Sequence, residues 1–206
     1  QTKLSKLLKE KILLIGSGRT DSGVHAIEQS AHFECKKEIQ NLDKFLKSVN
    51  HFVNDMSVSI INIKKRNINF HARFSAKQRI YKYIIFNRLS RPSIEKGRGW
   101  HIIKELDVTL MKEGTKKLLG TKDFSTFRSS SCNAKSPIRT MKSIKIKSIK
   151  GRIEIQFKSQ SFLQQQVRSM VGCLKYLAEK KWDLKKFDSI FKSKKRILCA
   201  PPAPAE

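Results

Sequence analysis

The fold of this chain is decided by the stretch Ser143-Ile-Lys-Ile-Lys-Ser-Ile-Lys-Gly-Arg-Ile-Glu-Ile-Gln-Phe157. Apolar and polar residues mostly alternate on both sides of Lys150-Gly151, as they do in strands that bury one face. Glycine at the centre is typical of a tight turn. The stretch therefore predicts a β-hairpin.

The segment after the hairpin, Phe162 to Ala178, has the periodicity of a helix. Its apolar stripe is expected in the core and consists of Leu163, Val167, Met170, Val171, Leu174 and Leu177. Before the hairpin, Arg79 to Phe86 predicts a strand, and Asp107 to Leu119 predicts a helix that Gly120 ends. A short helix is expected around Phe187 to Phe191, before a proline-rich tail.

The first part of the chain predicts short strands and helices in alternation. Helices are expected from residue 1 to about 10 and from Leu42 to Val49, and strands at Ile12 to Ile15, Ser30 to Cys35 and Val58 to Ile63. We place a boundary near residue 70, which gives halves of residues 1–70 and 71–206. Both mix helix and strand, so the predicted class is α+β.

The charge of the chain indicates a polyanionic partner. It has 44 Lys and Arg against 17 Asp and Glu, a formal net charge of +27, with 39% hydrophobic residues. The apolar content supports a folded core and excludes a disordered basic tail. Nucleic acid is the leading partner class, although scattered lysines can also merely solvate a surface.

Other classes are disfavoured by what the sequence lacks. The four cysteines and five histidines have no paired-ligand spacing, so neither a zinc module nor a disulfide scaffold is expected. There is no long uncharged apolar run, and the amphipathic start differs from a signal peptide. We therefore expect a soluble intracellular protein. A bacterial cytoplasm and an organelle would both suit it, and of the two we choose the cytoplasm.

A glycine-bracketed loop, Gly16-Ser-Gly-Arg-Thr-Asp-Ser-Gly23, follows the first predicted strand. It lacks the spacing of a dinucleotide-binding or P-loop motif. Within it, Arg19 is two residues from Asp21 and can steady an ionised carboxylate, which suits a nucleophile or a general base. Taken alone, such an aspartate is more often a turn residue that caps local amides, so the residues by themselves do not decide between these roles.

Five ordered motifs resemble the TruA-type tRNA pseudouridine synthases. They are Gly18-Arg-Thr-Asp-Ser-Gly-Val-His-Ala26; His71-Ala-Arg-Phe-Ser-Ala76 with Arg79-Ile-Tyr-Lys-Tyr83; Gly120-Thr-Lys-Asp-Phe-Ser125; Cys132-Asn-Ala-Lys-Ser-Pro-Ile-Arg-Thr140; and Phe162-Leu-Gln-Gln-Gln-Val-Arg-Ser-Met-Val-Gly172. Together they span almost the whole chain. The resemblance implies two RRM-like (ferredoxin-like) halves that form a mainly antiparallel sheet with a basic catalytic cleft.

The resemblance also implies the catalytic roles. Asp21 would be the catalytic aspartate, Arg168 its partner, Arg19 the residue that positions the flipped nucleotide, and Tyr81 the ring packed against the target uracil. Without the resemblance, Tyr81 is an ordinary cross-strand aromatic and Arg168 a surface arginine. Further substrate contacts are expected from His71, Arg73, Arg79, Arg128 and Arg139, whereas Phe124, Phe127 and Phe162 are assigned to the core.

The family reaction breaks the N-glycosidic bond of a uridine and rejoins the base through C5. It requires no cofactor and no metal. The resemblance implies tRNA as substrate, with target uridines in the anticodon stem-loop, at or near positions 38 to 40, and a homodimer as the working form. Asp21 would initiate the reaction by adding to the sugar or base, or by assisting deprotonation of the sugar.

The chain departs from the family at both ends. The opening strand with its Gly-Trp-Gln segment is missing before Gln1, and so is the final strand after Ala200-Pro-Pro-Ala-Pro-Ala-Glu206. We expect either a fragment or a fold that has lost an edge strand from each half, with lower stability as the consequence. Two alternatives to the enzyme remain at this point: a non-catalytic RNA-binding protein and a degenerate synthase that binds tRNA without turnover.

Overall fold

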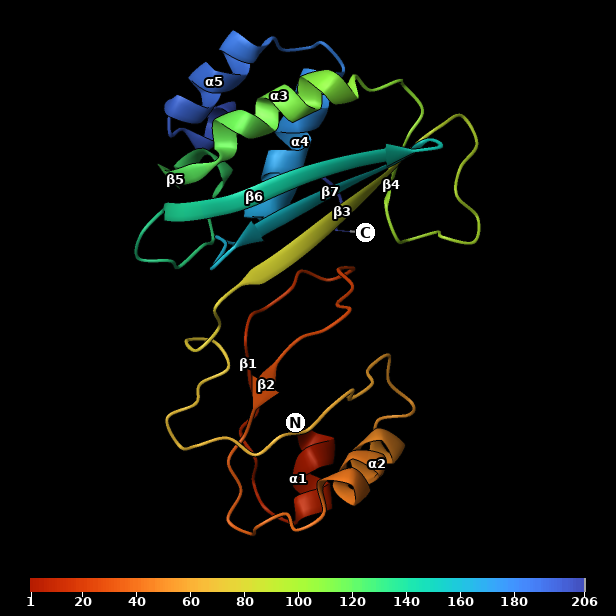
Figure 1. Cartoon of the computed structure of the whole chain (residues 1–206), viewed down its shortest axis with the longest axis vertical. Coiled ribbons are helices and arrows are strands. Elements are labelled where there is room, and N and C mark those ends of the chain that lie inside the picture. Colours follow the sequence, from red (N-terminus) through yellow and green to blue (C-terminus); the bar gives the residue numbers. More distant parts are fainter. Residues whose placement is uncertain (206) are drawn as a thin grey trace. The chain divides into compact units, whose positions relative to one another are not determined.

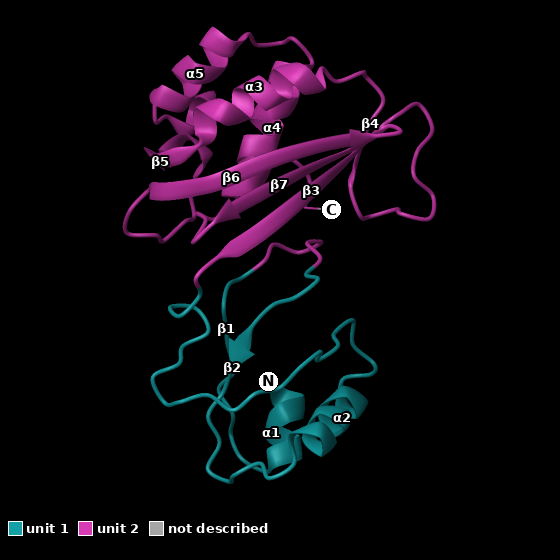
Figure 2. Cartoon of the chain, in the orientation of Figure 1, with its two compact units in different colours: residues 1–19, 26–76 teal, residues 20–25, 77–206 magenta. Residues whose placement is uncertain are grey.

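A computed structural model describes residues 1–205 and divides the chain into two compact units (Figure 2). Unit 1 contains residues 1–19 and 26–76, and unit 2 contains residues 20–25 and 77 onward. The division thus follows Ala76, six residues after the boundary placed from the sequence. The glycine-bracketed loop is split, and its Asp21 segment belongs to unit 2.

Unit 1 has two helices and one small two-stranded sheet (Figure 1). Its elements are α1 (Thr2–Leu8), β1 (Ile15–Gly16), β2 (Ala31–His32) and α2 (Leu42–Phe52). The Asn41 side chain accepts a hydrogen bond from the Lys44 amide at 2.8 Å and so caps α2. The small core of this unit contains Leu4, Ile12, Phe45 and Val49.

The strands predicted for unit 1 are largely wrong. Of the predicted strand 12–15 only Ile15 pairs, with His32, and of 30–35 only Ala31 and His32 pair, the former with Gly16. Residues 58–63 form no strand. In that segment the backbone of Ile60 is hydrogen-bonded to a side chain instead of to a neighbouring strand. Asn50 of α2 donates to the carbonyl of Ile60 at 2.9 Å and accepts from its amide at 2.7 Å. An apolar run extends to a strand only where a neighbouring backbone is available.

Unit 2 is built on a five-stranded sheet in the order β4-β3-β7-β6-β5. The strands are β3 (Arg79–Asn87), β4 (Trp100–Ile102), β5 (Gly120–Asp123), β6 (Ile138–Ile149) and β7 (Arg152–Ser159). All neighbours are antiparallel except β3 and β4. The predicted hairpin is confirmed as β6–β7, with Gly151 at a φ of +75° in its turn. The short strands β4 and β5 were not predicted.

The three longer helices of unit 2 lie on one face of this sheet (Figure 1). They are α3 (Val108–Leu118), α4 (Gln166–Ala178) and α5 (Leu184–Lys192), with 3-10 turns at Ser125–Phe127 and Arg196–Leu198. Strand β7 alternates as predicted: Ile153, Ile155 and Phe157 are buried beneath the helices. The α+β class is confirmed as a mixed fold with a mainly antiparallel sheet, and the RRM-like halves stay a prediction.

The ends of the helices are set by local hydrogen bonds, which the pattern of apolar residues does not reveal. Helix α4 starts four residues after the predicted Phe162, because Gln165 adopts a φ of 58° and Gln166 accepts from the Leu163 amide at 2.8 Å. Helix α5 begins three residues earlier than predicted, where Asp183 accepts from the Lys186 amide. Helix α3 is capped by Asp107 and stops just before Gly120, as expected.

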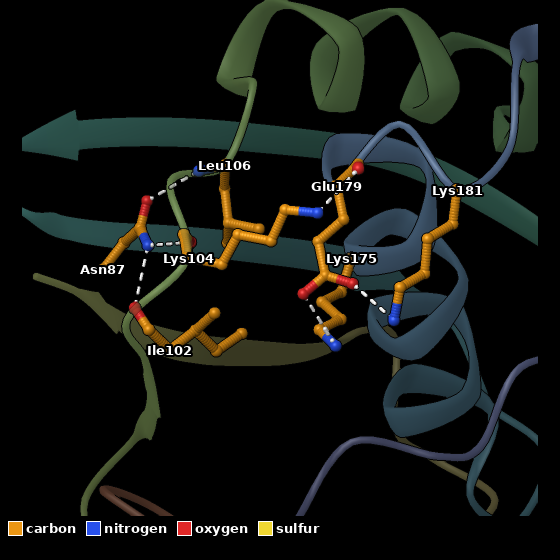
Figure 3. A network of polar contacts seen from close by, with 7 residues as sticks. All are labelled: Asn87, Ile102, Lys104, Leu106, Lys175, Glu179 and Lys181. Carbon is orange, nitrogen blue, oxygen red and sulfur yellow. Dashed lines mark hydrogen bonds and ion pairs between the residues drawn. The ribbon is translucent and has the colours of Figure 1, made fainter.

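A polar network fixes the C-terminal end of α4 (Figure 3). The Asn87 amide donates to the carbonyls of Ile102 and Lys104, both at 2.8 Å, and accepts from the Leu106 amide at 3.0 Å. The Lys104 ammonium reaches the carbonyl of Glu179 at 3.4 Å. The buried Glu179 carboxylate binds Lys175 at 2.9 Å and Lys181 at 3.1 Å.

Those two lysines decide the protonation of Glu179. Burial raises the pKa of the Glu179 carboxyl, but hydrogen bonds from both lysines outweigh burial and leave the pKa below its usual value. The network therefore stays charged at neutral pH. It holds the C-terminal end of α4 in place.

Candidate functional site

The first turn of α4 carries Arg168, which meets Asp21 of the loop 20–25. The Arg168 Nη1 atom lies 2.5 Å from Asp21 Oδ2, although 147 residues separate the two in sequence. Their side chains are 22% and 31% exposed, respectively. A short ion pair with this degree of burial is only partly screened by water, so the guanidinium orients the carboxylate.

Tyr81 lies in the same unit, on the helix-covered face of β3. It pairs across the sheet with the buried Phe157, and its ring meets Phe162 edge-on, with centroids 5.0 Å apart and an interplanar angle of 85°. Burial raises the pKa of the Tyr81 hydroxyl; the charge of Arg79 opposes this and the charge of Asp21 adds to it. The phenol is thus neutral and within the electrostatic reach of the Asp21 carboxylate.

Three residues from the sequence-derived set therefore come together: Asp21, Arg168 and Tyr81. A carboxylate held by a guanidinium next to an aromatic ring is suited to act on a flat, uncharged ring that stacks there. Phe162, which the sequence assigned to the core, supports the edge of Tyr81.

The sequence analysis missed the segment that holds the other side of Arg168. Arg168 Nε donates to the Ala203 carbonyl at 2.7 Å, and the Ala203 amide donates to the Arg168 carbonyl at 3.0 Å. The prolines around Ala203 were interpreted only as preventing regular structure. The two contacts have no signal in local sequence, because they join residues far apart in the chain.

Arg79, Arg128 and Arg139, which were expected to contact substrate, also belong to unit 2. Arg79 donates to the Gln160 carbonyl at 2.6 Å. Arg128 donates from Nη2 to two carbonyls of the loop that follows it, and Arg139 from Nη1 to two carbonyls of the same loop. Burial lowers the pKa of the Arg139 guanidinium, and its Nε is a buried donor with no acceptor among residues 1–205. Arg128 and Arg139 thus hold the segment 132–138, which leads into β6.

Arg19, His71 and Arg73 belong to unit 1. Arg19 and Arg73 are exposed. The His71 ring stacks on Phe74 with centroids 4.3 Å apart, and its Nδ1 accepts from the amides of Arg73 and Phe74 at 3.2 and 3.4 Å. The proton of a neutral His71 is therefore on Nε2, which leaves that nitrogen as a donor.

A pair of thiols lies at the start of the proline-rich segment. Cys199 Sγ is 3.3 Å from Cys173 Sγ of α4, and both cysteines are free. The hydrogen bond from Cys173 lowers the pKa of the Cys199 thiol, and the charge of Arg196 adds to this against the effect of burial. The same hydrogen bond, together with burial, raises the pKa of Cys173. Cys199 is therefore the more acidic thiol.

Among residues 1–205, no three His, Cys, Asp or Glu side chains gather as a possible metal-ligand set. Within the same residues, every helix is too short or too polar to cross a membrane.

Comparison with known proteins places this geometry in a family. A sequence model described as tRNA pseudouridine synthase matches residues 115–206. The chain is 81% identical over 206 residues to tRNA pseudouridine synthase A of Pelagibacter ubique (strain HTCC1062), covering 100% of this chain and 84% of that protein.

Two more distant relatives carry the same name. The protein from Maricaulis maris (strain MCS10) is 35% identical over 201 residues, covering 98% of this chain and 80% of its own length. The one from Parvibaculum lavamentivorans (strain DS-1) is 36% identical over 197 residues, with 96% and 80% covered.

These matches define the class as an isomerase of tRNA modification, which converts uridine in tRNA to pseudouridine. The chain belongs to the tRNA pseudouridine synthase A family. The resemblance noted in the sequence motifs is thereby confirmed, and a non-catalytic RNA-binding protein is no longer the competing class.

Proposed function

We propose that this chain isomerises uridines of the tRNA anticodon stem-loop, with Asp21 as the catalytic nucleophile. The observation that carries the proposal is the 2.5 Å ion pair between Asp21 and Arg168, and the charge of Asp21 also acts on the Tyr81 hydroxyl. Arg168 orients the Asp21 carboxylate, and Tyr81 packs against the target uracil. Arg19 positions the nucleotide that has left the stack.

The proposed reaction rearranges the uridine alone and consumes no second reactant. The bond between N1 and C1′ of the uridine breaks, the base turns, and a bond between C5 and C1′ forms. The hydrogen on C5 leaves as a proton, and N1 takes up a proton. Asp21 opens the sequence by adding to C1′ of the sugar as the base departs, and the bond between Asp21 and C1′ breaks again when C5 bonds to C1′. This splits one difficult step into two easier ones and frees the carboxylate.

The remaining basic residues bind the RNA in this proposal. Arg79, Arg128 and Arg139 contact phosphates, and so do His71 and Arg73. A net charge of +27 supports strong, salt-dependent attraction to tRNA. A homodimer and a cytoplasmic location belong to the same proposal, and sedimentation of the free chain tests the dimer.

The test is tritium release from tRNA labelled at uridine C5, because the new bond must expel that hydrogen. We expect release by the parent chain, and tRNA binding without release by Asp21→Asn. The matched control is Asp188→Asn, which removes another aspartate from a 2.6 Å ion pair, with Lys192. Full turnover by Asp21→Asn would refute the nucleophile; binding without release by the parent chain would indicate a degenerate synthase.

The target position has a separate test. Transcripts in which the uridines at positions 38 to 40 are replaced by cytidine should still bind but release no tritium. Undiminished release from such transcripts would refute the anticodon stem-loop as the site of modification.

A further inference from the structure

The proline-rich segment Ala200–Ala205, here called the C-terminal strap, lies along α4 next to Arg168. Ala200 and Ala203 of the strap are 3% and 0% exposed, so it is packed into unit 2. Proline has no amide hydrogen and a fixed φ, so such a segment stays extended without a sheet partner and has little freedom to lose on folding.

The strap holds both the backbone and the side chain of Arg168 through one residue. The Ala203 amide donates to the Arg168 carbonyl at 3.0 Å, and the Ala203 carbonyl accepts from Arg168 Nε at 2.7 Å. The guanidinium is planar and its donors form a rigid fork. With Nε held by the strap, the direction in which Nη1 meets Asp21 is fixed.

Two residues keep the strap in this position. Gly172 lies one turn after Arg168, and a Cβ at this glycine would collide with the carbonyl oxygen of Pro201, so strap and helix touch backbone to backbone. On the other side, the Tyr83 hydroxyl of β3 donates to the Pro204 carbonyl at 2.9 Å.

We infer that the C-terminal strap positions Arg168 for the reaction, and that Gly172 and Tyr83 are positioning residues that act through it. The inference rests on the proposed function, which gives Arg168 its role. Neither positioning residue has to touch the tRNA. Their contribution is to the geometry of the ion pair between Asp21 and Arg168, in a site where a misplacement of about 1 Å can cost about 100-fold in rate.

The main variant is Gly172→Ala, measured by single-turnover tritium release at saturating tRNA. The added methyl group must push the strap off α4, whereas alanine itself is more favourable than glycine within a helix. We expect a rate about 10- to 100-fold lower, with the concentration of tRNA at half-saturation changed less than about twofold. Tyr83→Phe removes one anchor of the strap without adding bulk, and we expect a smaller loss of the same kind.

The matched control is Gly114→Ala. A Cβ at Gly114 of α3 would lie 2.5 Å from Leu177 Cδ2, so this variant overpacks the same core with no contact to the strap. It should change the melting temperature without a selective loss of rate. If Gly172→Ala and Tyr83→Phe both keep the rate of this control, the inference is overturned.

A double variant separates positioning from stability. In the background of Arg168→Lys, which lacks the rigid fork, Gly172→Ala should lower the rate no further. Equal, multiplying losses in both backgrounds would show that the strap does not act through Arg168. Full turnover by Arg168→Lys alone would refute the role of Arg168 in the proposed function. A loss of rate with Arg168→Lys but not with Gly172→Ala would refute only the positioning role of the strap.

Discussion

The ion pair between Asp21 and Arg168 should contribute measurably to the stability of unit 2. We consider Asp21→Asn, Arg168→Met and the double variant, because a double-mutant cycle isolates the coupling between the two side chains. Arg168→Met also loses the hydrogen bond to the Ala203 carbonyl, and the cycle subtracts that loss.

The geometry of the ion pair sets the expected size of this coupling. Two unit charges about 4 Å apart attract by about 4 kcal/mol at an effective dielectric constant of about 20, which is a ceiling before desolvation. Fully exposed pairs are worth about 0–1 kcal/mol, and hydrogen bonds to charged groups about 1.5–3 kcal/mol. With side chains 31% and 22% exposed, the pair lies between these limits. We expect a coupling of about 1–2 kcal/mol.

The assay is urea unfolding followed by tryptophan fluorescence. The chain has two tryptophans, Trp100 and Trp182, and both lie in unit 2, so the signal reports the unit that contains the ion pair. A cycle on Glu113 and Lys116 is the control, because that pair is 2.7 Å long but 44% and 67% exposed. It should give about 0.2–0.5 kcal/mol. A coupling for Asp21 and Arg168 no larger than this control would refute the view that Arg168 holds the carboxylate.

Three further predictions concern the surroundings of the site. The pKa of Glu179 is lower in the folded protein than its ordinary value of 4.5, so the charged carboxylate stabilises the fold above pH 4.5 and this stabilisation is lost as the pH falls through the folded pKa. The difference in melting temperature between the parent chain and Glu179→Gln should therefore shrink as the pH is lowered through that range. Iodoacetamide should modify Cys199 before Cys173, as read by peptide mass spectrometry, and the reverse order would contradict the assigned acidities. Asn87→Ala removes three hydrogen bonds and should lower the free energy of urea unfolding by about 2–4 kcal/mol; a loss below about 1 kcal/mol would show that water replaces them.

Local pattern predicted the second half of the fold better than the first. The β6–β7 hairpin and the apolar stripe of α4 are confirmed because one face of each is buried against a large core, which enforces the alternation visible in sequence. In unit 1, residues 58–63 carry a similar apolar run, yet the Asn50 side chain takes up the backbone groups of Ile60. Apolar content alone does not say which partner a backbone will find.

The candidate site was predicted in part for a comparable reason. Motifs with a specific order identified Asp21, Tyr81 and Arg168, and these three do come together in unit 2. The supporting residues were missed. Gly172 was noted only as part of a motif, and nothing in a helical pattern shows that its missing side chain makes room for a carbonyl of the strap.

By itself, the sequence determined that this chain is a basic α+β protein with a glycine-bracketed aspartate, a β-hairpin and an amphipathic helix, because charge, turn residues and periodicity are local properties. Only the tertiary structure decided that Asp21 meets Arg168 across 147 residues, and that Ala203 holds the other side of the same guanidinium. Those contacts depend on how strands and helices pack, and packing joins side chains whose distance along the chain carries no information about their distance in space.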